Sequence, residues 1–426
     1  MRILLLGAGG FIGRHIVAEL LRGGHEVVAV VRRAHGLDRA FPAVRFVEMD
    51  LAGAVQLADW GPLLHGVDLI VNAAGLLRGP AMEAVHVAMP RALHAAAVQA
   101  GVRRAVLISA ISARGDVATD YARTKLAGEE ALRQSGLNWT ILRPSLVYGE
   151  GSYGGTSLMR GLAGLPFLLP IAGKGNFAFS PIHVQDLART VRIVCEDECF
   201  AAQAIEPVGP NTIDLKGLLQ RYRNWLGFGP AWTVPIPMPF MTLLGRLGDL
   251  LGDGPVSSNS LRQMVAGNAG DSTRFAAEIG FVPRSLDEAL RDHPAQVQDR
   301  WHARLFFMAP AIKAVLILLW LASGLLGLFH GAADTDAFIA VAGLDPGLAT
   351  PLRIGTSLLD FLLAGLVLID RRARWSTVAQ FAVVLGYTVV LGAVLPGLWS
   401  DPLGPLLKNL PVMLLILVHG AIGDHR

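Results

Sequence analysis

RILLLGAGGFIG, residues 2–13, joins an unbroken apolar run to a glycine-rich turn. A short apolar run without polar alternation is typical of a parallel strand buried on both faces. The periodic pattern of residues 14–22 predicts the helix that follows. Glycines between them let the backbone approach an anionic ligand, with the N–H groups of the helix start pointing at it. We therefore predict a phosphate-binding turn, the alternative being a turn with a purely structural role.

The spacing of the glycines narrows the type of turn. Gly7, Gly10 and Gly13 fit G-x-x-G-x-x-G, whereas G-x-G-x-x-G fails because its third glycine would fall on Ile12. This spacing resembles that of extended and atypical short-chain dehydrogenases/reductases. The resemblance extends weakly to about residue 295, where the chain is similar to the NADPH-binding accessory subunit of respiratory complex I. It implies an α/β Rossmann domain with a doubly wound parallel sheet and a small C-terminal lobe.

The composition divides the chain in two. Only 17% of the 426 residues are charged, and the apolar excess is concentrated after Met308. We expect an NAD(P)-binding domain at residues 1–295, a linker at 296–305 and an all-α four-helix transmembrane domain at 306–426. Four segments are long enough to cross a bilayer: residues 307–329, 352–369, 376–398 and 406–422.

Charges around the predicted spans indicate their orientation. Arginines fill the turn between the second and third spans, and aspartates lie in the loops at the other side. The positive-inside rule therefore places the nucleotide-binding domain, the arginine turn and the C-terminus in the cytoplasm. We expect a multi-pass protein of the inner membrane. A nucleic-acid partner is not expected, because the soluble part has no Lys/Arg cluster with interleaved aromatic residues.

The membrane half resembles DoxX-like four-helix proteins, in its span lengths and in the segments LWLASG (319–324) and PLGPLLKN (402–409). Asp360 stands near the middle of the second predicted span, where a carboxylate is costly unless it is protonated or paired. Two alternatives remain open for it: a proton or quinone-headgroup site, and a helix-packing contact. Lys408 is a possible partner.

The second predicted strand, residues 26–31, ends in Arg32-Arg33. An acidic residue there would accept the ribose 2′-OH of NAD, whereas arginine suits the 2′-phosphate of NADP. We expect NADP(H), with NAD possible; the alternative is that the arginines only face solvent. The resemblance implies that Asp50 meets the adenine and that residues 73–75 pass under the cofactor. The residues expected to hold it are Gly7, Gly10, Phe11, Ile12, Gly13, Arg32, Arg33, Asp50, Leu51, Ala73, Ala74, Gly75, Lys125 and Pro144.

The sequence YARTK, residues 121–125, holds the catalytic candidates Tyr121 and Lys125, which share a helix face. An ammonium beside a phenol lowers the pKa of the phenol, which can then pass a proton to or from a substrate oxygen. The segment follows the fifth predicted strand and precedes residues 138–142, the order found in short-chain dehydrogenases. The alternative is a pair that only positions NADPH.

The family's third catalytic member is a serine or threonine near the end of the fifth strand. The chain has Ser109-Ala110-Ile111-Ser112, with Ala110 at the usual position. Either Ser109 or Ser112 substitutes, with Ser109 the candidate retained, or the hydroxyl is missing. The extended family often has asparagine where His86 stands.

Three further features carry less specific expectations. Residues 151–169 could form an apolar lid, and the helix at 240–251 could contact either the bilayer or the sheet domain. His183 is expected to be structural, and Cys195 and Cys199 lack the companions of a metal site.

Together these features predict a membrane-tethered NAD(P)H-dependent oxidoreductase that transfers hydride to a lipophilic carbonyl or quinone-type substrate. Its partners would be that small molecule and the lipid bilayer. One alternative is a non-catalytic NADPH-binding module that senses redox state or stabilises a membrane redox complex. Another, implied by the resemblance, is a sugar-nucleotide epimerase or dehydratase.

Overall fold

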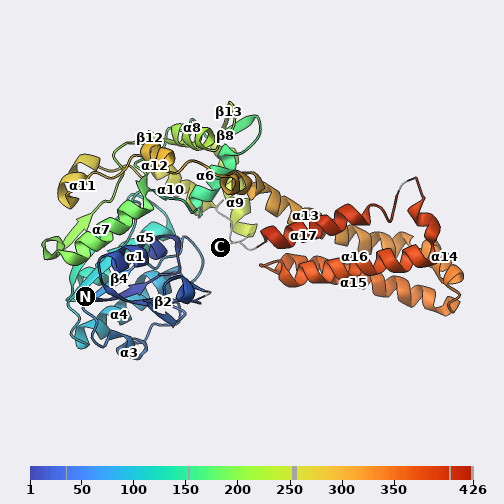
Figure 1. The fold of residues 1–426 in the computed structure, drawn as a ribbon, viewed down its shortest axis with the longest axis horizontal. Helices are drawn as coiled ribbons and strands as arrows, with labels where there is room; N and C mark the ends of the chain where they lie inside the picture. Colours follow the sequence, from blue (N-terminus) through green and yellow to red (C-terminus); the bar gives the residue numbers. More distant parts are fainter. Residues whose placement is uncertain (35, 152–153, 252–256, 403, 424–426) are drawn as a thin grey trace. The chain divides into compact units, whose positions relative to one another are not determined.

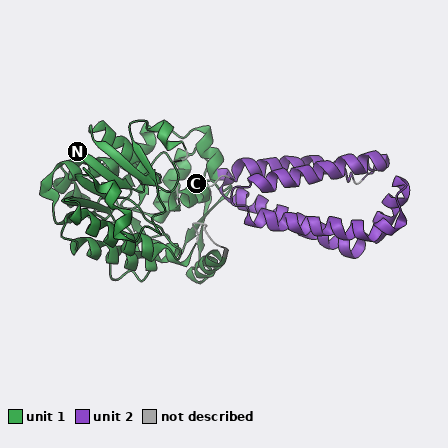
Figure 2. Ribbon diagram, turned by 90° about the horizontal axis from the view of Figure 1, so that it is seen from below, with its two compact units in different colours: residues 1–303 green, residues 304–426 purple. Residues whose placement is uncertain are grey.

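The computed structural model describes residues 1–34, 36–151, 154–251, 257–402 and 404–423. The chain forms two compact units, Met1–Ala303 and Arg304–Arg426, which Figure 2 colours separately. Helix α13 (Val297–His330) runs through the division between them. The segment expected to be a linker is therefore helical from Val297 onward, because it holds no glycine or proline before Pro310.

A seven-stranded sheet forms the centre of the first unit, in the order β11-β6-β5-β4-β1-β2-β3 (Figure 1). All of its neighbouring strands are parallel. The chain leaves β1 in one direction and returns on its other side, which confirms the predicted doubly wound fold. The strands are β1 (Arg2–Leu6), β2 (Glu26–Val31), β3 (Arg45–Glu48), β4 (Leu69–Asn72), β5 (Arg104–Ile108), β6 (Asn138–Leu142) and β11 (Gln203–Ile205).

Strand β1 shows why an unbroken apolar run stands at the centre of the sheet. Ile3 and Leu5 pack into the core beneath α1 and α7, whereas Leu4 and Leu6 pack into the opposite core beneath α4 and α5. Because helices cover both faces, a polar residue at any of these positions would be buried. The helices are α1 (Phe11–Arg22), α4 (Met89–Gln99), α5 (Asp120–Arg133) and α7 (Val184–Glu196).

A smaller lobe with its own apolar core completes the first unit. Residues 155–163 form α6, in which Met159 and Ala163 are buried in that core. The expected lid is therefore a packed helix over these residues, while positions 152–153 lie outside the described residues. The other elements of the lobe are α8 (Leu215–Trp225), α9 (Met238–Leu251), α10 (Ser258–Ala266), α12 (Leu286–Asp292), and the strand pairs β7 (Val147–Tyr148) with β10 (Ile182–His183), β8 (Leu168–Ala172) with β13 (Trp232–Ile236), and β9 (Ala178–Phe179) with β12 (Ile213–Asp214). Helix α11 (Ser272–Ile279) packs instead into the sheet core beneath α1 and α7, through Phe275 and Ile279.

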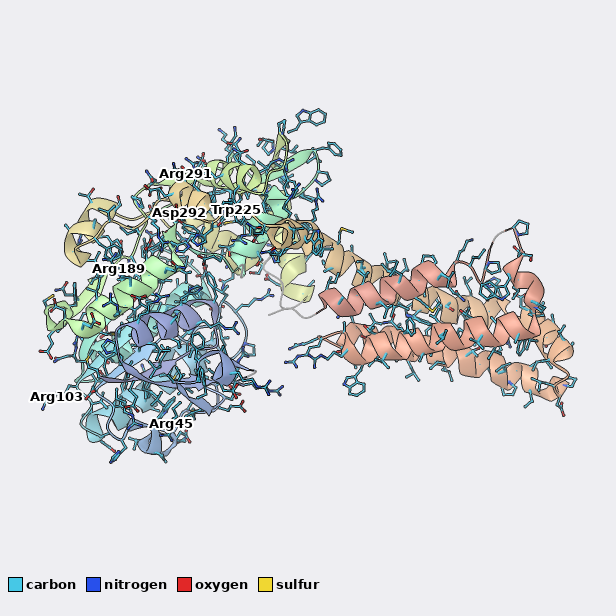
Figure 3. All side chains as sticks on the ribbon, viewed as in Figure 1. Arg45, Arg103, Arg189, Trp225, Arg291 and Asp292 are labelled. Carbon is cyan, nitrogen blue, oxygen red and sulfur yellow. The ribbon has the colours of Figure 1, made fainter. Side chains whose placement is uncertain are left out.

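Helix α12 is held against α8 just before the chain enters α13. The indole nitrogen of Trp225 donates to the carbonyl oxygen of His293 at 2.7 Å, and Figure 3 shows Trp225 beside Arg291 and Asp292. These contacts attach the segment that leads into α13 to the smaller lobe.

The second unit is helical, as predicted, and its described residues include three helices long and apolar enough to cross a membrane. They are α13, α15 (Ala349–Ile369) and α16 (Arg374–Val394). The fourth predicted span forms α17 (Asn409–Ile422), whose 14 residues fall short of the roughly 20 that a bilayer requires. The predicted loop after the first span instead contains helix α14 (Ala332–Ala342), because its two aspartates are spaced among helix-forming alanines.

Asp360 is buried inside the second unit, with a fractional exposure of 5%. The hydroxyl of Ser323 on α13 donates to its carboxylate at 2.6 Å. Lys408 is exposed at the start of α17 and makes no ion pair with Asp360 among the described residues, so the suggested pairing is wrong. Asp360 therefore joins α13 to α15 by a hydrogen bond, of the kind that polar side chains form between helices in membranes.

Candidate active site

The glycine turn after β1 has the conformation of a backbone cradle. Gly7 has a φ of +77°, and a Cβ on it would lie 2.8 Å from the carbonyl of Ala73. A Cβ on Gly13 would lie 2.1 Å from the Gly7 oxygen, so α1 can approach β1 only with glycine there. Gly10 caps α1 without a side-chain hydrogen bond, and the first turn holds no acidic residue. These features fit a diphosphate held by backbone N–H groups.

The residues that follow the cradle support it from two sides. Arg14 donates through Nε to the carbonyl oxygen of Gly9 at 3.1 Å, which holds the turn in place. The ring of Phe11 lies directly beneath the loop after β7, where a Cβ on Gly149 or Gly151 would come within 3.4 Å of it. Phe11 therefore positions that loop, while Ile12 lies at the edge of the core beneath α1.

Arg32 and Arg33 follow β2 and are both exposed. Neither forms an ion pair with another described residue. One acidic group does reach this turn, because the Glu48 carboxylate at the end of β3 accepts a hydrogen bond from the Ala34 amide at 2.7 Å. The sequence does not indicate Glu48, because its approach to this turn depends on the pairing of Val31 with Glu48 across β2 and β3.

Asp50 and Leu51 follow β3 at the same edge of the sheet. Asp50 is exposed, and its carboxylate accepts a hydrogen bond from the Ala52 amide at 3.1 Å. Leu51 is buried in the core beneath α4. The structure therefore leaves Asp50 at the surface for a ligand contact and gives Leu51 a packing role.

The turn after β4 packs against the glycine cradle. The Ala73 amide donates to the carbonyl oxygen of Leu6 at 3.1 Å, and the Ala74 amide donates to the Asn72 side chain at 3.0 Å. A Cβ on Gly75 would lie 3.1 Å from Lys125 Nζ. Gly75 therefore brings this turn and the predicted catalytic lysine together.

Tyr121 and Lys125 lie one turn apart on α5, whose first turn is capped by the Thr119 hydroxyl. Lys125 Nζ donates to the carbonyl oxygen of Ile108 at 3.0 Å and lies 5.9 Å from the centre of the Tyr121 ring. Burial lowers the pKa of Lys125 to about 8, opposed by the nearby charge of Glu129. Burial also raises the pKa of Tyr121 to about 12, which is opposite to the lowering expected from the sequence. At neutral pH the Tyr121 hydroxyl therefore keeps its proton.

His86 joins the β4 turn to the catalytic helix. Its Nε2 accepts a hydrogen bond from the Leu76 amide at 3.0 Å, and its Nδ1 lies 2.8 Å from the Thr124 hydroxyl. Thr124 donates its own proton to the Asp120 carbonyl, so Nδ1 carries the hydrogen of a neutral imidazole. Burial, assisted by Lys125, lowers the pKa of His86 to about 3 and keeps the ring neutral.

A π-helical turn, residues 84–88, presents His86 at this position. A Cβ on Gly128 would lie 2.3 Å from the His86 carbonyl oxygen, so glycine is what lets α5 approach the turn. One signal of this residue is present in the sequence, namely a histidine at a position where the family that the chain resembles often has asparagine.

Glu129 on α5 is the shared hydrogen-bond acceptor of several surrounding side chains, and the sequence does not indicate this role. Its carboxylate is fully buried and accepts hydrogen bonds from the Ser109 hydroxyl at 2.6 Å, from Arg133 at 3.0 Å and from Arg143 at 2.5 Å. The Ser109 proton is thus committed to Glu129, so the structure does not offer this hydroxyl to a substrate. Ser112, the other candidate, is buried in the turn after β5.

Two further predicted residues lie in the loop after β6 and at the end of β10. The carbonyl oxygen of Pro144 accepts a hydrogen bond from the Ile111 amide at 3.0 Å, which joins the loops after β5 and β6. His183 caps α7, and its Nδ1 lies 3.0 Å from Arg284. Burial and the positive charge of Arg284 lower the pKa of His183 to about 4. His183 therefore has a structural environment.

The two units match different families of known proteins. Residues 7–163 match a family model described as NAD(P)H-binding, and residues 317–417 match the DoxX-like family. The chain is similar to ceramide reductase of Caulobacter vibrioides, with 26% identity over 58% of this chain and 77% of that protein. Sterol demethylase protein B of Methylococcus capsulatus is 28% identical over 70% of this chain and 99% of that protein.

A third relative and two solved structures extend the comparison. NADH dehydrogenase [ubiquinone] 1 alpha subcomplex subunit 9 of Mus musculus is 23% identical over 59% of this chain and 67% of that protein. A nucleoside-diphosphate-sugar epimerase from Staphylococcus aureus has a TM-score of 0.57 and 17% identity, covering 68% of this chain and all of that one. UDP-glucuronic acid 4-epimerase from Bacillus cereus has a TM-score of 0.53 and 18% identity, covering 68% and 97%. These two structures show the fold alone.

The fold, the cradle and these similarities define the class of protein. The N-terminal unit is an NAD(P)-binding, Rossmann-like domain that is similar to short-chain dehydrogenases and epimerases. The C-terminal unit is a DoxX-like membrane domain. The chain therefore combines an oxidoreductase-like or epimerase-like fold, with reductases among its relatives, and a DoxX-like helical part whose helices are long and apolar enough to cross a membrane.

Proposed function

We propose that the chain is a membrane-anchored, NADPH-dependent reductase acting on a lipophilic carbonyl, enone or quinone-type substrate at the cytoplasmic face of the inner membrane. One observation carries the proposal. Lys125, whose Nζ lies 5.9 Å from the centre of the Tyr121 ring, meets the turn of Gly75 at the carboxyl edge of the sheet. The Tyr121 hydroxyl has no hydrogen-bond partner among the described residues and is thus available to a substrate.

The cofactor would be held by the backbone of the glycine cradle and by the arginines after β2. Gly7 and Gly13 let the β4 turn and α1 pack closely on the cradle, because a Cβ on either glycine would collide with neighbouring backbone, and the start of α1 has no acidic residue to repel a diphosphate. Arg32 and Arg33 are exposed cations at the end of β2, and guanidinium groups bind phosphate well. We therefore infer a preference for NADPH over NADH.

The chain's own residues would then manage the proton. When bound, NADPH supplies a hydride. Tyr121, protonated at neutral pH, donates its proton to the substrate oxygen, and Lys125 as an ammonium stabilises the phenolate that remains. His86, neutral and bonded to both the β4 turn and Thr124, holds α5 in register with that turn.

A lipophilic substrate is supported by the relatives and by α9. The names of two relatives refer to a ceramide and a sterol, both lipids. Phe240, Leu243, Leu247 and Leu250 on α9 are all exposed and recur at helical spacing. Such a face is suited to the surface of a bilayer, where a lipophilic substrate resides.

A non-catalytic NADPH-binding module, working within a membrane redox complex, is the second candidate. The observation in its favour is the commitment of the Ser109 hydroxyl to Glu129, which withdraws the third catalytic group. Similarity to an accessory subunit of NADH dehydrogenase points the same way.

The test uses the full-length protein in detergent with a panel of lipid carbonyls and quinones. We expect NADPH oxidation that falls about a hundredfold or more in Tyr121→Phe, because general acid catalysis contributes about that much. NADPH binding by calorimetry should be unchanged, and Tyr222→Phe, buried in the smaller lobe, should retain activity. A wild-type protein that binds NADPH but oxidises it with no substrate of the panel would contradict the reductase and support the module.

A further inference from the structure

A cavity of about 120 Å³ lies at one end of the second unit, and both apolar and polar residues line it. It is formed where α13, the turn between α15 and α16, and the end of α17 meet. Its polar lining comprises Lys313, Asp370, Arg371 and His419. All of these residues belong to the membrane domain, and the proposed reduction uses none of them.

Small residues bring the helix ends close enough to form this cavity. A Cβ on Gly423 would lie 2.5 Å from the Cβ of Ala373, and a Cβ on Gly420 would lie 2.7 Å from the Thr377 hydroxyl oxygen. Ala373 has a φ of +53°, a strained conformation for a residue with a side chain. The close approach of α17 to this turn is therefore specific to these residues.

The lining of the cavity holds two cationic side chains, Lys313 and Arg371, and one acidic side chain, Asp370, so positive charge prevails among its side chains. Asp370 is the acidic residue of the lining, and its carboxylate accepts hydrogen bonds from the backbone amides of Arg372 at 3.2 Å and Ser376 at 2.9 Å. The carboxyl ends of α15 and α17 add partial negative charge. Lys313 covers one of those carbonyl groups, since its Nζ donates to the Leu368 oxygen at 3.1 Å. A lysine has three donors, so two remain for a ligand.

The cavity lies at the level where the helices end, which is the expected depth of a headgroup. Ile369 ends α15, Arg374 begins α16 and Ile422 ends α17. Trp375 beside this turn is 76% exposed, as is typical of aromatic residues at a membrane–water interface. From Lys313 to the end of α13 the helix has 18 residues, or roughly 27 Å, which is about the hydrocarbon thickness.

We propose that this cavity binds the phosphate group of an anionic phospholipid, with Lys313 and Arg371 as the cationic contacts and His419 as a polar wall. A basic pocket between membrane helices is a recognised form of headgroup site. A soluble phosphate offers the same charge but gains nothing from the apolar surface beside the cavity. Exposed Leu368 and Leu417 provide that surface for the acyl chains.

Native mass spectrometry of the full-length protein tests the proposal. One sample of the protein in detergent receives phosphatidylglycerol, and a parallel sample receives phosphatidylcholine with the same acyl chains. Each protein is then released from the detergent, and the lipid that it retains is measured. We expect retention of phosphatidylglycerol, and a loss of about tenfold or more in the double variant Lys313→Gln/Arg371→Gln, because two charge-assisted contacts are removed. Lys313→Arg should retain the lipid.

Arg372→Gln is the matched control, because Arg372 is exposed in the same turn but lies outside the lining. It should bind phosphatidylglycerol within about twofold of the wild type, since removing an exposed charge at a distance costs little. Equal retention of both lipids, or unchanged retention by the double variant, would overturn the proposal. Displacement of the lipid by excess inorganic phosphate would instead assign the cavity to a soluble anion. Equal thermal unfolding midpoints of the variants exclude misfolding as the cause of a loss.

Discussion

The Ser109 hydroxyl donates a hydrogen bond to Glu129 Oε1 at 2.6 Å, where the end of β5 meets α5. Glu129 lies one helical turn beyond Lys125 and two turns beyond Tyr121, on the same face of α5. Because Arg143 after β6 donates to the same carboxylate, Glu129 ties α5 to two neighbouring strands. The position of the Tyr121–Lys125 pair therefore depends on a buried ion pair outside the predicted site.

Replacement of Glu129 should weaken the whole first unit. Glu129→Ala removes the buried acceptor of Ser109, Arg133 and Arg143, and breaking such a pair costs about 3–5 kcal/mol. A lower thermal unfolding midpoint of the full-length protein measures the loss. The adjacent Glu130 is exposed, so Glu130→Ala should cost under about 1 kcal/mol. Equal midpoints for the two variants would show that Glu129 is not an anchor.

Gly13→Ala should abolish nucleotide binding. A Cβ there would lie 2.1 Å from the Gly7 oxygen, so α1 must move away from β1, and overpacking of this kind costs about 1–3 kcal/mol. Calorimetric titration with NADPH measures the binding. Gly61→Ala is the control, because a Cβ on Gly61 meets no atom within 4 Å and the variant should bind normally. Normal NADPH affinity in Gly13→Ala would argue against the cradle.

Arg32→Ala should distinguish the two nicotinamide cofactors. Loss of one charge-assisted contact costs about 1.5–3 kcal/mol, so NADPH affinity should fall roughly ten- to a hundredfold while NADH affinity stays unchanged. Arg45→Ala, at the amino end of β3, should leave both affinities unchanged (Figure 3). If Arg32→Ala weakens both cofactors equally, the guanidinium does not contact a 2′-phosphate.

The rate of NADPH oxidation should fall as the pH rises through about 8. The pKa of Lys125 is about 8 and that of Tyr121 about 12, so the ammonium is lost while the phenol is still protonated. The pH profile of kcat/KM measures this limb. Lys125→Arg keeps its charge in this range, so it should move the limb to higher pH. A profile unchanged by that substitution would remove Lys125 from the reaction.

Deprotonation of Lys125 should lower the reaction rate as the pH rises, but it should raise the stability of the fold. Its pKa in the folded protein lies below the ordinary value of 10.5, so the unfolded chain holds more protons between about pH 8 and 10.5. Stability contributed by this group therefore rises with pH across that window. Unfolding midpoints of the wild type and Lys125→Met, compared across the window, should show this rise only in the wild type.

The turns at the carboxyl edge of the sheet could be predicted because each depends on local sequence. The apolar run of β1, the glycines after it and the Tyr-x-x-x-Lys spacing each occupy a few neighbouring positions. Parallel strands then bring their carboxyl ends to one edge without further information. The roles of Glu48, His86 and Glu129 could not be predicted in this way, because their partners lie 14, 38 and 20 positions away.

In the membrane half, too, local features could be predicted from the sequence, whereas contacts between distant segments could not. Apolar length and composition predicted a helical unit, but they did not show that the loop after the first span folds into α14 or that α17 has only 14 residues. They also left the partner of Asp360 open. Packing of α13 on α15 decided it, since Ser323 comes within 2.6 Å while Lys408 stays exposed.

The sequence by itself determined the doubly wound sheet, the glycine cradle and the helical membrane unit. Each follows from periodicity and from residues with particular backbone requirements, which act over short distances. The tertiary structure alone decided the electrostatics. It raises the pKa of Tyr121, lowers the pKa of Lys125, and directs the Ser109 hydroxyl to the carboxylate of Glu129. Burial and opposing charges set those properties, and both arise only when distant segments pack together.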